Sequence, residues 1–208
     1  MTHKPLIKIC GMTSIDNLSR ILFLEPDYVG FIFYPKSPRY VVGKIKPDLL
    51  SIVPPNVTKV GVFVNATEAE ILHHAVAFDL GAVQLHGAET PELCRKLKQR
   101  GYSVIKTFSI AEAHDFDRIE EYADCVDFYL FDTKSAAFGG AGTHFDWQLV
   151  LRHPIRRSWF LAGGIGPDNI AEASQTGAAG LDLNSRFEIE PGIKDYSKLA
   201  TALSSIRA

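Results

Sequence analysis

The stretch LIKICGMTS, residues 6–14, joins a β-rich run to the start of a helix. Its apolar residues are typical of a buried strand, and Thr13 or Ser14 can cap a helix that begins just beyond them. Eight β-rich runs recur along the chain, and each is followed by residues with helix signals. The runs cover residues 6–11, 28–33, 59–64, 82–87, 103–109, 128–133, 159–165 and 180–185.

The segments between the runs carry start and stop signals for helices. Pro91 lies near the start of one segment and Gly101 just past its end, and Pro167 and Gly177 repeat this arrangement. Eight strand–helix units predict an α/β fold, a single (β/α)8 TIM barrel whose one catalytic domain spans residues 1–208. An open doubly wound sheet is the main alternative, but it usually carries fewer strands and a GxGxxG motif, which CGMTS lacks.

The composition argues against several classes of protein. A net charge of −2 provides neither the basic stripe of a nucleic-acid-binding protein nor a polybasic membrane anchor. No run approaches the ~20 apolar residues of a membrane span, and the first residues do not resemble a signal peptide. Three widely spaced cysteines make no disulfide framework. We therefore expect a cytoplasmic protein with a small-molecule substrate and with no nucleic-acid or membrane partner.

Polar residues share one face in four of the runs. The pairs are Lys8 with Cys10, Gln84 with His86, Leu130 with Asp132, and Asp182 with Asn184. Because alternate residues of a barrel strand face the lumen, these side chains should point inward at the carboxyl end, where barrel enzymes have their active sites. The first and last strands are neighbours in a closed barrel, so we also predict a buried ion pair between Lys8 and Asp182.

Two glycine-bearing stretches, LAGGIGPDN and DLNSRFE, follow the seventh and eighth runs. Backbone N–H groups at such turns bind phosphate, and these two loops form the usual phosphate site of the barrel fold. The residues by themselves therefore predict an enzyme that acts on a phosphorylated small molecule. The candidate chemical groups are Cys10 and Asp132, on roughly opposite sides of the barrel mouth.

Seven motifs, spread over most of the chain, point to one known family. They are KICGMT, GFIFYPKSPRYV, VQLHG, FDT, GGAGTHFDW, LAGGI and GLDLNSRFEIEPGIKD. Together they resemble the phosphoribosylanthranilate isomerases of tryptophan biosynthesis. The resemblance implies an Amadori rearrangement, in which N-(5-phosphoribosyl)anthranilate becomes 1-(2-carboxyphenylamino)-1-deoxyribulose 5-phosphate, the third step from chorismate. It implies an aldose–ketose isomerase that uses no metal and no cofactor, as a monomer or a homodimer.

The resemblance also implies roles for three side chains. Asp132 would be the general acid that protonates the ribose ring oxygen, and Cys10 the general base that then removes the C2 proton. A thiol must have a pKa below its usual ~8.5 to be a competent base, and we expect the start of the first helix to lower it. Arg39 would bind the anthranilate carboxylate, which suits a forked guanidinium.

The remaining site residues follow from the same resemblance. Asp182 matches an acidic residue near the ribose hydroxyls, and Gln84 and His86 match a substrate-binding motif. The residues that match the phosphate site are Gly142, Gly163, Gly164, Asn184, Ser185 and Arg186. Two motifs depart from the common pattern, since many members have GGTGKTFDW and DVSSG where this chain has GGAGTHFDW and DLNSR. Arg186 replaces a glycine there, so a left-handed backbone at this position would be strained.

Three other functions stay open at this point. A pentulose-phosphate epimerase would need a metal held by several histidines and aspartates, and only His86 is available. Indole-glycerol-phosphate synthase would need a lysine acid and an additional N-terminal segment. A phosphate-binding barrel without catalysis would have no need of both Cys10 and Asp132.

Overall fold

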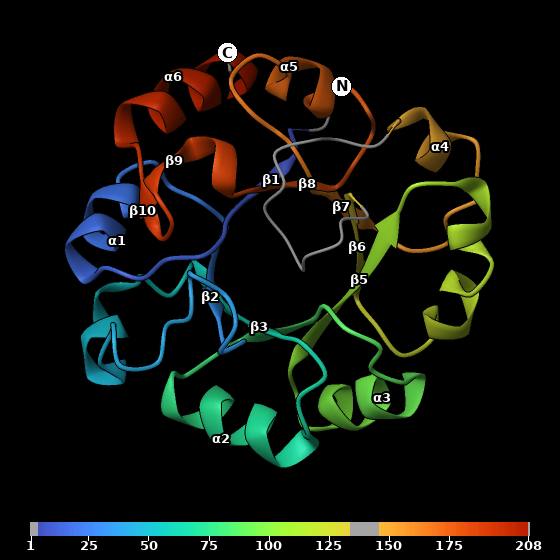
Figure 1. Cartoon of the computed structure of the whole chain (residues 1–208), viewed down its shortest axis with the longest axis horizontal. Helices are drawn as coiled ribbons and strands as arrows, with labels where there is room; N and C mark the ends of the chain where they lie inside the picture. Colours follow the sequence, from blue (N-terminus) through green and yellow to red (C-terminus); the bar gives the residue numbers. More distant parts are fainter. Residues whose placement is uncertain (1–3, 134–145, 208) are drawn as a thin grey trace.

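Eight parallel strands form a closed barrel in the computed structural model, which describes residues 4–133 and 146–207 (Figure 1). The strands follow one another in chain order, and the last pairs with the first. They are β1 (Leu6–Ile9), β2 (Tyr28–Ile32), β3 (Thr58–Phe63), β4 (Ala82–Leu85), β5 (Ser103–Ile110), β6 (Phe128–Thr133), β7 (Trp159–Leu161) and β8 (Gly180–Leu183). The predicted barrel is therefore confirmed, with each strand inside the run that predicted it or within a residue of it.

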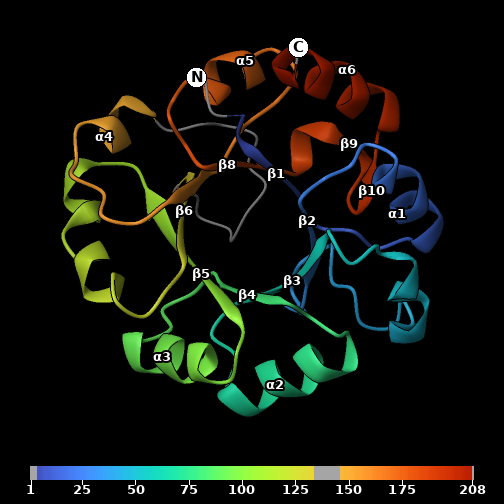
Figure 2. The same cartoon turned by 180° about the vertical axis from the view of Figure 1, so that it is seen from behind.

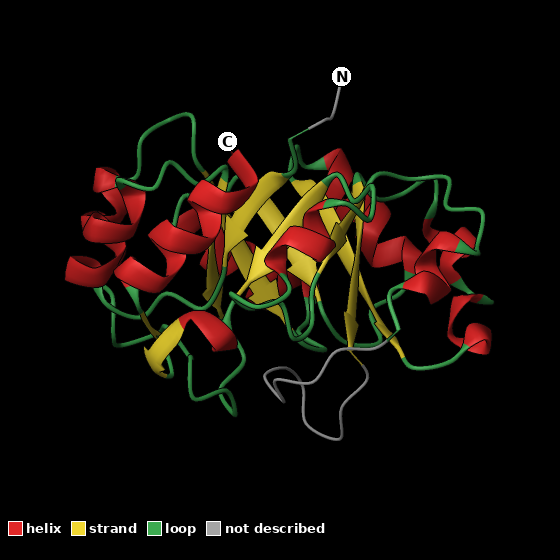
Figure 3. Cartoon of the chain, turned by 90° about the horizontal axis from the view of Figure 1, so that it is seen from above, coloured by secondary structure: helices red, strands yellow, loops and turns green. Residues whose placement is uncertain are grey.

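Helices surround the strands on the outside of the barrel, as the two end-on views and the side view show (Figures 1, 2 and 3). The α-helices are α1 (Ile15–Leu22), α2 (Glu68–Ala77), α3 (Pro91–Gln99), α4 (Gln148–Leu151), α5 (Ile170–Ser174) and α6 (Tyr196–Arg207). Within the two described stretches, no helix has both the length and the apolar character that crossing a membrane requires.

The segments after β2 and β5 differ from the predicted alternation of strands and helices. They form short 3-10 helices: η1 (Pro47–Ile52), η2 (Ala113–Phe116) and η3 (Ile119–Tyr122). Pro47 begins η1, and Pro54 follows its end. A proline has no N–H to donate within a helix, so a long α-helix is disfavoured between these two positions.

Side-chain caps begin α1 and α2, and the cap at Ser14 is one of the two that the sequence predicted for the first helix. The Ser14 hydroxyl caps α1, and Thr67 forms a capping box with Glu70 at the start of α2. These side chains satisfy backbone N–H groups that have no partner inside the helix. Pro91 occupies the first turn of α3, and Gly101 follows that helix with a φ of +91°. The local signals therefore place α1, α2 and α3 correctly.

Two apolar clusters separate the inside of the barrel from its outer layer. The inner cluster consists of Val60, Ala82, Ile105, Leu130, Phe160 and Ala162. A larger cluster, which includes Tyr129 and Phe131, packs between the strands and the helices. Leu130 therefore faces the lumen while its two neighbours face outward, as the sequence alternation predicts. Asp132, two residues farther along β6, also faces inward.

The predicted ion pair between Lys8 and Asp182 is present at the seam between β1 and β8. The two residues are partners in the strand register, and Lys8 Nζ lies 2.9 Å from Asp182 Oδ1. The Lys8 side chain is fully buried and that of Asp182 is 9% exposed. Burial acts to lower the pKa of Lys8, but Asp182 and Cys10 together outweigh this effect and raise the pKa above its ordinary value. The ammonium group is therefore held in its charged form.

Beyond β8, the chain adds a hairpin that the sequence analysis did not predict. After η4 (Ser185–Phe187), it forms β9 (Glu188–Glu190) and β10 (Ile193–Lys194), which lie beside α1 (Figure 1). The Asn17 side chain of α1 donates a 2.9 Å hydrogen bond to Lys194 O and accepts one of 2.8 Å from Lys194 N. The hairpin is therefore fixed against the first strand–helix unit.

We expect Lys8→Met to lower the free energy of unfolding by about 3–5 kcal/mol, because it leaves Asp182 as a buried charge without its partner. Lys59→Met is the matched control, since Lys59 Nζ lies 2.7 Å from Asp79, whose side chain is 93% exposed. The control should lose no more than about 1 kcal/mol. Urea unfolding at neutral pH measures both changes, and equal losses would contradict a structural role for the buried pair.

Candidate active site

Cys10 follows β1 directly, and its thiol lies inside the barrel with only 3% of the residue exposed. Gly30 of β2 leaves the necessary space, since a Cβ at that position would lie 2.7 Å from Cys10 Sγ. Burial raises the pKa of the Cys10 thiol above its ordinary value, although the nearby Lys8 ammonium acts to lower it. The predicted lowering of the pKa is therefore wrong for the free protein, because the loss of hydration destabilises the thiolate more than the ammonium groups of Lys8 and Lys194 stabilise it.

Asp132 and His86 come together from β6 and from the end of β4. His86 Nε2 lies 3.4 Å from Asp132 Oδ2, and the two side chains are 13% and 16% exposed. The other carboxylate oxygen, Oδ1, accepts a 2.8 Å hydrogen bond from the backbone N–H of Thr133. One oxygen of Asp132 is thus fixed by the backbone, and the other faces the imidazole.

Gln84 contacts His86 through its other ring nitrogen. Gln84 Nε2 lies 3.1 Å from His86 Nδ1 and 3.2 Å from Thr107 Oγ1. With the amide N–H as donor, Nδ1 is the acceptor, and the neutral imidazole carries its proton on Nε2, toward Asp132. Thr107, Gln84, His86 and Asp132 therefore form a chain of polar contacts across the carboxyl ends of β4, β5 and β6.

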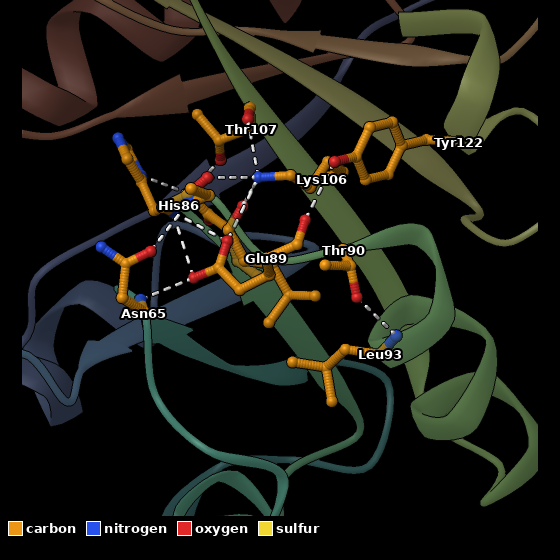
Figure 4. Close-up of polar contacts among 12 residues, drawn as sticks. Asn65, His86, Glu89, Thr90, Leu93, Lys106, Thr107 and Tyr122 are labelled. Carbon is orange, nitrogen blue, oxygen red and sulfur yellow. Dashed lines mark hydrogen bonds and ion pairs between the residues drawn. The ribbon is translucent and has the colours of Figure 1, made fainter. Parts of the chain in front are cut away.

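A buried ion pair fixes the backbone from which His86 projects (Figure 4). Lys106 Nζ donates hydrogen bonds to the carbonyl oxygens of Leu85, at 3.1 Å, and Gly87, at 2.7 Å. It also lies 3.2 Å from Glu89 Oε2, and neither side chain is more than 3% exposed. Glu89 in turn accepts a hydrogen bond from the backbone N–H of Gly87. The residues on both sides of His86 are therefore held by Lys106.

Arg39 is buried and pairs with Glu188 of the hairpin. Arg39 Nε lies 2.9 Å from Glu188 Oε1, and Nη2 lies 2.5 Å from Oε2. Lys194 Nζ lies 2.7 Å from the same Oε1 and 2.7 Å from Asn184 Oδ1. Burial acts to raise the pKa of Glu188, but the hydrogen bonds from Arg39 and Lys194 outweigh it and hold the pKa below its ordinary value. Glu188 is therefore a carboxylate shared by two basic side chains.

Gly11 brings Arg39 and Asn184 close to Cys10. Its φ is +81°, and a Cβ there would lie 2.7 Å from Arg39 Cδ and 2.9 Å from Asn184 Oδ1. A glycine adopts this left-handed conformation without strain and leaves the space that both side chains occupy. The end of β1, the loop after β2 and the end of β8 therefore meet at one place.

The predicted phosphate residues that the structure describes lie in the two segments that follow β7 and β8. Gly163 and Gly164 follow β7 with φ values of +77° and +69°. Arg186, after β8, joins the loops, since its Nη1 donates a 3.0 Å hydrogen bond to Gly164 O and its Nη2 lies 2.6 Å from Asp168 Oδ1. Arg186 itself has no positive φ, so the strain considered for its replacement of a glycine does not arise.

A match to a family model shows which family the chain represents. The model, described as N-(5'phosphoribosyl)anthranilate (PRA) isomerase, matches residues 7–204. The chain belongs to this family. A relative from Parabacteroides distasonis, named N-(5'-phosphoribosyl)anthranilate isomerase, is 42% identical over 209 aligned positions, which cover 97% of this chain and 93% of the relative. The family predicted from the seven motifs is therefore confirmed.

Solved structures of the phosphoribosylanthranilate isomerase family share this fold. The enzyme from Thermotoga maritima matches with a TM-score of 0.89 at 36% identity, over 98% of both chains. A second structure is of the isomerase in complex with reduced 1-(O-carboxyphenylamino)-1-deoxyribulose 5-phosphate. It matches with a TM-score of 0.83 at 35% identity, again over 98% of both chains.

Sequence reasoning about this family member missed the residues that contact Arg39. Glu188 and Lys194 both lie in the last of the seven motifs. The Pro191–Gly192 pair between them is a turn signal, and it is the local feature from which the hairpin could have been predicted. No local signal links Arg39 to Glu188, which lies 149 residues away.

Two expectations, the phosphate role of Gly142 and the absence of a metal site, concern the whole chain and therefore extend beyond the described residues. Gly142 and most of its motif fall in the segment 134–145, which the structure does not describe. In residues 4–133 and 146–207, no group of three or more His, Cys, Asp or Glu side chains is arranged to hold a metal ion.

We expect Gly163→Ala to destabilise the protein more than Gly177→Ala does. Both glycines have a left-handed backbone, with φ values of +77° and +78°, which costs either alanine about 1–2 kcal/mol. A Cβ at Gly163 would also overlap Thr133 Oγ1 and would lie 2.6 Å from Thr133 N and 2.7 Å from Asp132 Oδ1, whereas the space at Gly177 is open. The crowding should add about 1–3 kcal/mol in urea unfolding. Equal losses would mean that Asp132 is not packed against this loop.

Proposed function

We propose that the protein isomerises N-(5-phosphoribosyl)anthranilate to 1-(2-carboxyphenylamino)-1-deoxyribulose 5-phosphate, in the third step from chorismate in tryptophan biosynthesis. One observation carries the proposal: a thiol and a carboxyl group face the lumen from the ends of two strands of one barrel. Cys10 follows β1, and Asp132 lies next to the last residue of β6, beside Gly163 of the predicted phosphate loops. An aldose–ketose rearrangement needs one group to give a proton and another to take one.

Asp132 is the general acid in the first step. It donates a proton to the ring oxygen, the bond from C1 to that oxygen breaks, and the nitrogen lone pair forms a C1=N bond. His86 Nε2, 3.4 Å from Asp132 Oδ2, then donates toward the carboxylate that this transfer leaves behind. Since His86 is itself held through Gln84 and Lys106, the carboxyl group keeps one orientation through the step.

Cys10 is the general base in the second step. The positively charged C1=N group makes the C2 proton acidic, because the electron pair left on C2 moves toward nitrogen. The thiolate, which is the minor form of Cys10 in the free protein, takes this proton, and the resulting enolamine rearranges to the ketone at C2. Lys8 and Lys194 both act to lower the pKa of Cys10, so two ammonium groups favour the thiolate against burial.

The other side chains bind the two ends of the substrate. Arg39 takes the anthranilate carboxylate, and the loops that contain Gly163, Gly164 and Ser185 take the phosphate through backbone N–H groups. Asp182, oriented by Lys8, contacts the ribose hydroxyls. The residues that bind substrate therefore come from β8 and from the segments that follow β2, β7 and β8.

We expect Cys10→Ser and Asp132→Asn each to abolish turnover of freshly prepared phosphoribosylanthranilate, because each removes a group that moves a proton. The assay follows the loss of substrate fluorescence. Cys125→Ser is the matched control, since this buried thiol donates a 3.4 Å hydrogen bond to Tyr122 O that a hydroxyl also makes. Full activity in both site variants would reject the acid–base assignment, and an inactive wild-type protein would reject the function.

We expect the Cys10 thiol of the free protein to keep its proton at neutral pH, because burial holds its pKa above the ordinary range of a thiol. The sign follows from burial, which disfavours the charged thiolate and so raises the pKa. The measurement is the ultraviolet absorbance of the thiolate against pH, taken as the difference between wild type and Cys10→Ser. A thiolate already formed at neutral pH would contradict this expectation.

A further inference from the structure

The contacts of Arg39 assign a role to a residue outside the predicted site. We propose that Glu188 is a positioning residue, which holds the Arg39 guanidinium ready for the aromatic carboxylate of the substrate and so selects aminoaldoses that carry this group. The inference rests on the proposed function and on the binding of that carboxylate by Arg39. It adds a specificity determinant from the β9–β10 hairpin.

Glu188 fixes one edge of the guanidinium and leaves the other edge available. Its carboxylate accepts from Nε and Nη2 of Arg39, at distances of 2.5–3.1 Å. Among the described residues, none accepts a hydrogen bond from Nη1 of Arg39. A guanidinium has five N–H donors in one plane, so the edge formed by Nη1 and Nη2 still has donors for a second, planar carboxylate.

Glu188 forms an ion pair with Lys194 as well as with Arg39. Lys194 Nζ and the backbone N–H of Gly192 both donate to Glu188 Oε1, at 2.7 and 3.0 Å. Burial lowers the pKa of Lys194, although Glu188 opposes this effect. Because Glu188 shares its charge with a second basic group, the attraction of Arg39 for an incoming carboxylate is not cancelled.

The hairpin that carries Glu188 is hydrogen-bonded to the segment that follows Cys10 and to α1. The backbone N–H and the hydroxyl of Thr13 donate to Gly192 O at 3.3 and 3.1 Å, and Asn17 holds Lys194 from α1. Thr13 lies three residues beyond Cys10. The position of Arg39 is therefore fixed relative to Cys10 through Glu188 and the hairpin. This reduces the conformational entropy that the side chain loses when substrate binds.

The test compares two substrates in three proteins. The substrates are phosphoribosylanthranilate and the corresponding adduct of aniline, which lacks the carboxylate. Glu188→Gln should raise KM for the anthranilate substrate about tenfold with little change in kcat, and should leave the kinetics of the aniline adduct unchanged. Glu190→Gln, an exposed glutamate on the same strand, is the matched control and should change neither.

Two outcomes would overturn the inference. Equal effects of Glu188→Gln on both substrates would show a merely structural role, and a lower KM for the anthranilate substrate would show that Glu188 competes with it. If Glu188→Gln does not fold, Glu188→Asp keeps the charge but shortens its reach, and it should raise KM for the anthranilate substrate alone. Failure of the proposed function is separate: it shows as wild-type protein without turnover, or as unchanged KM in Arg39→Met.

Discussion

The pairing of β1 with β8 is the constraint on which the site depends. It closes the barrel, sets Lys8 opposite Asp182, and brings the end of β1 next to the residues that follow β8. Cys10 and Asn184 lie beyond these two register partners, on the same inward face. If β1 slipped by one residue at this seam, Lys8 and Cys10 would turn toward the helices, and Asp182 would stay inside the barrel as a buried charge without its partner.

Burial and charge oppose each other around the thiol. The closed barrel removes Cys10 from water, which disfavours a thiolate, and it also brings Lys8 and Lys194 near enough to oppose that effect. Each lysine is paired with a carboxylate, so neither is an isolated buried charge. The same ion pairs therefore stabilise the seam and lie close to the thiol at the barrel mouth. The balance between burial and the charges of the two lysines decides how readily the thiol loses its proton.

Most of the fold could be predicted because its signals are local. The eight β-rich runs, the caps at Ser14 and Thr67 and the inward alternation of Leu130 and Asp132 each depend on a few neighbouring residues. The 3-10 helices after β2 and β5 could not be told from α-helices, since both begin with similar residues. The hairpin after β8 was missed because its strands have only three and two residues.

The sequence alone determined the barrel and the inward position of Lys8, Cys10, Asp132 and Asp182, because alternation within a strand and strand order along the chain fix both. It indicated the family through the resemblance of its seven motifs. Only the tertiary structure decided that Glu188 holds Arg39 and that burial raises the pKa of Cys10. The first depends on a contact between residues far apart in the chain. The second depends on how much water the assembled barrel excludes, which no single strand determines.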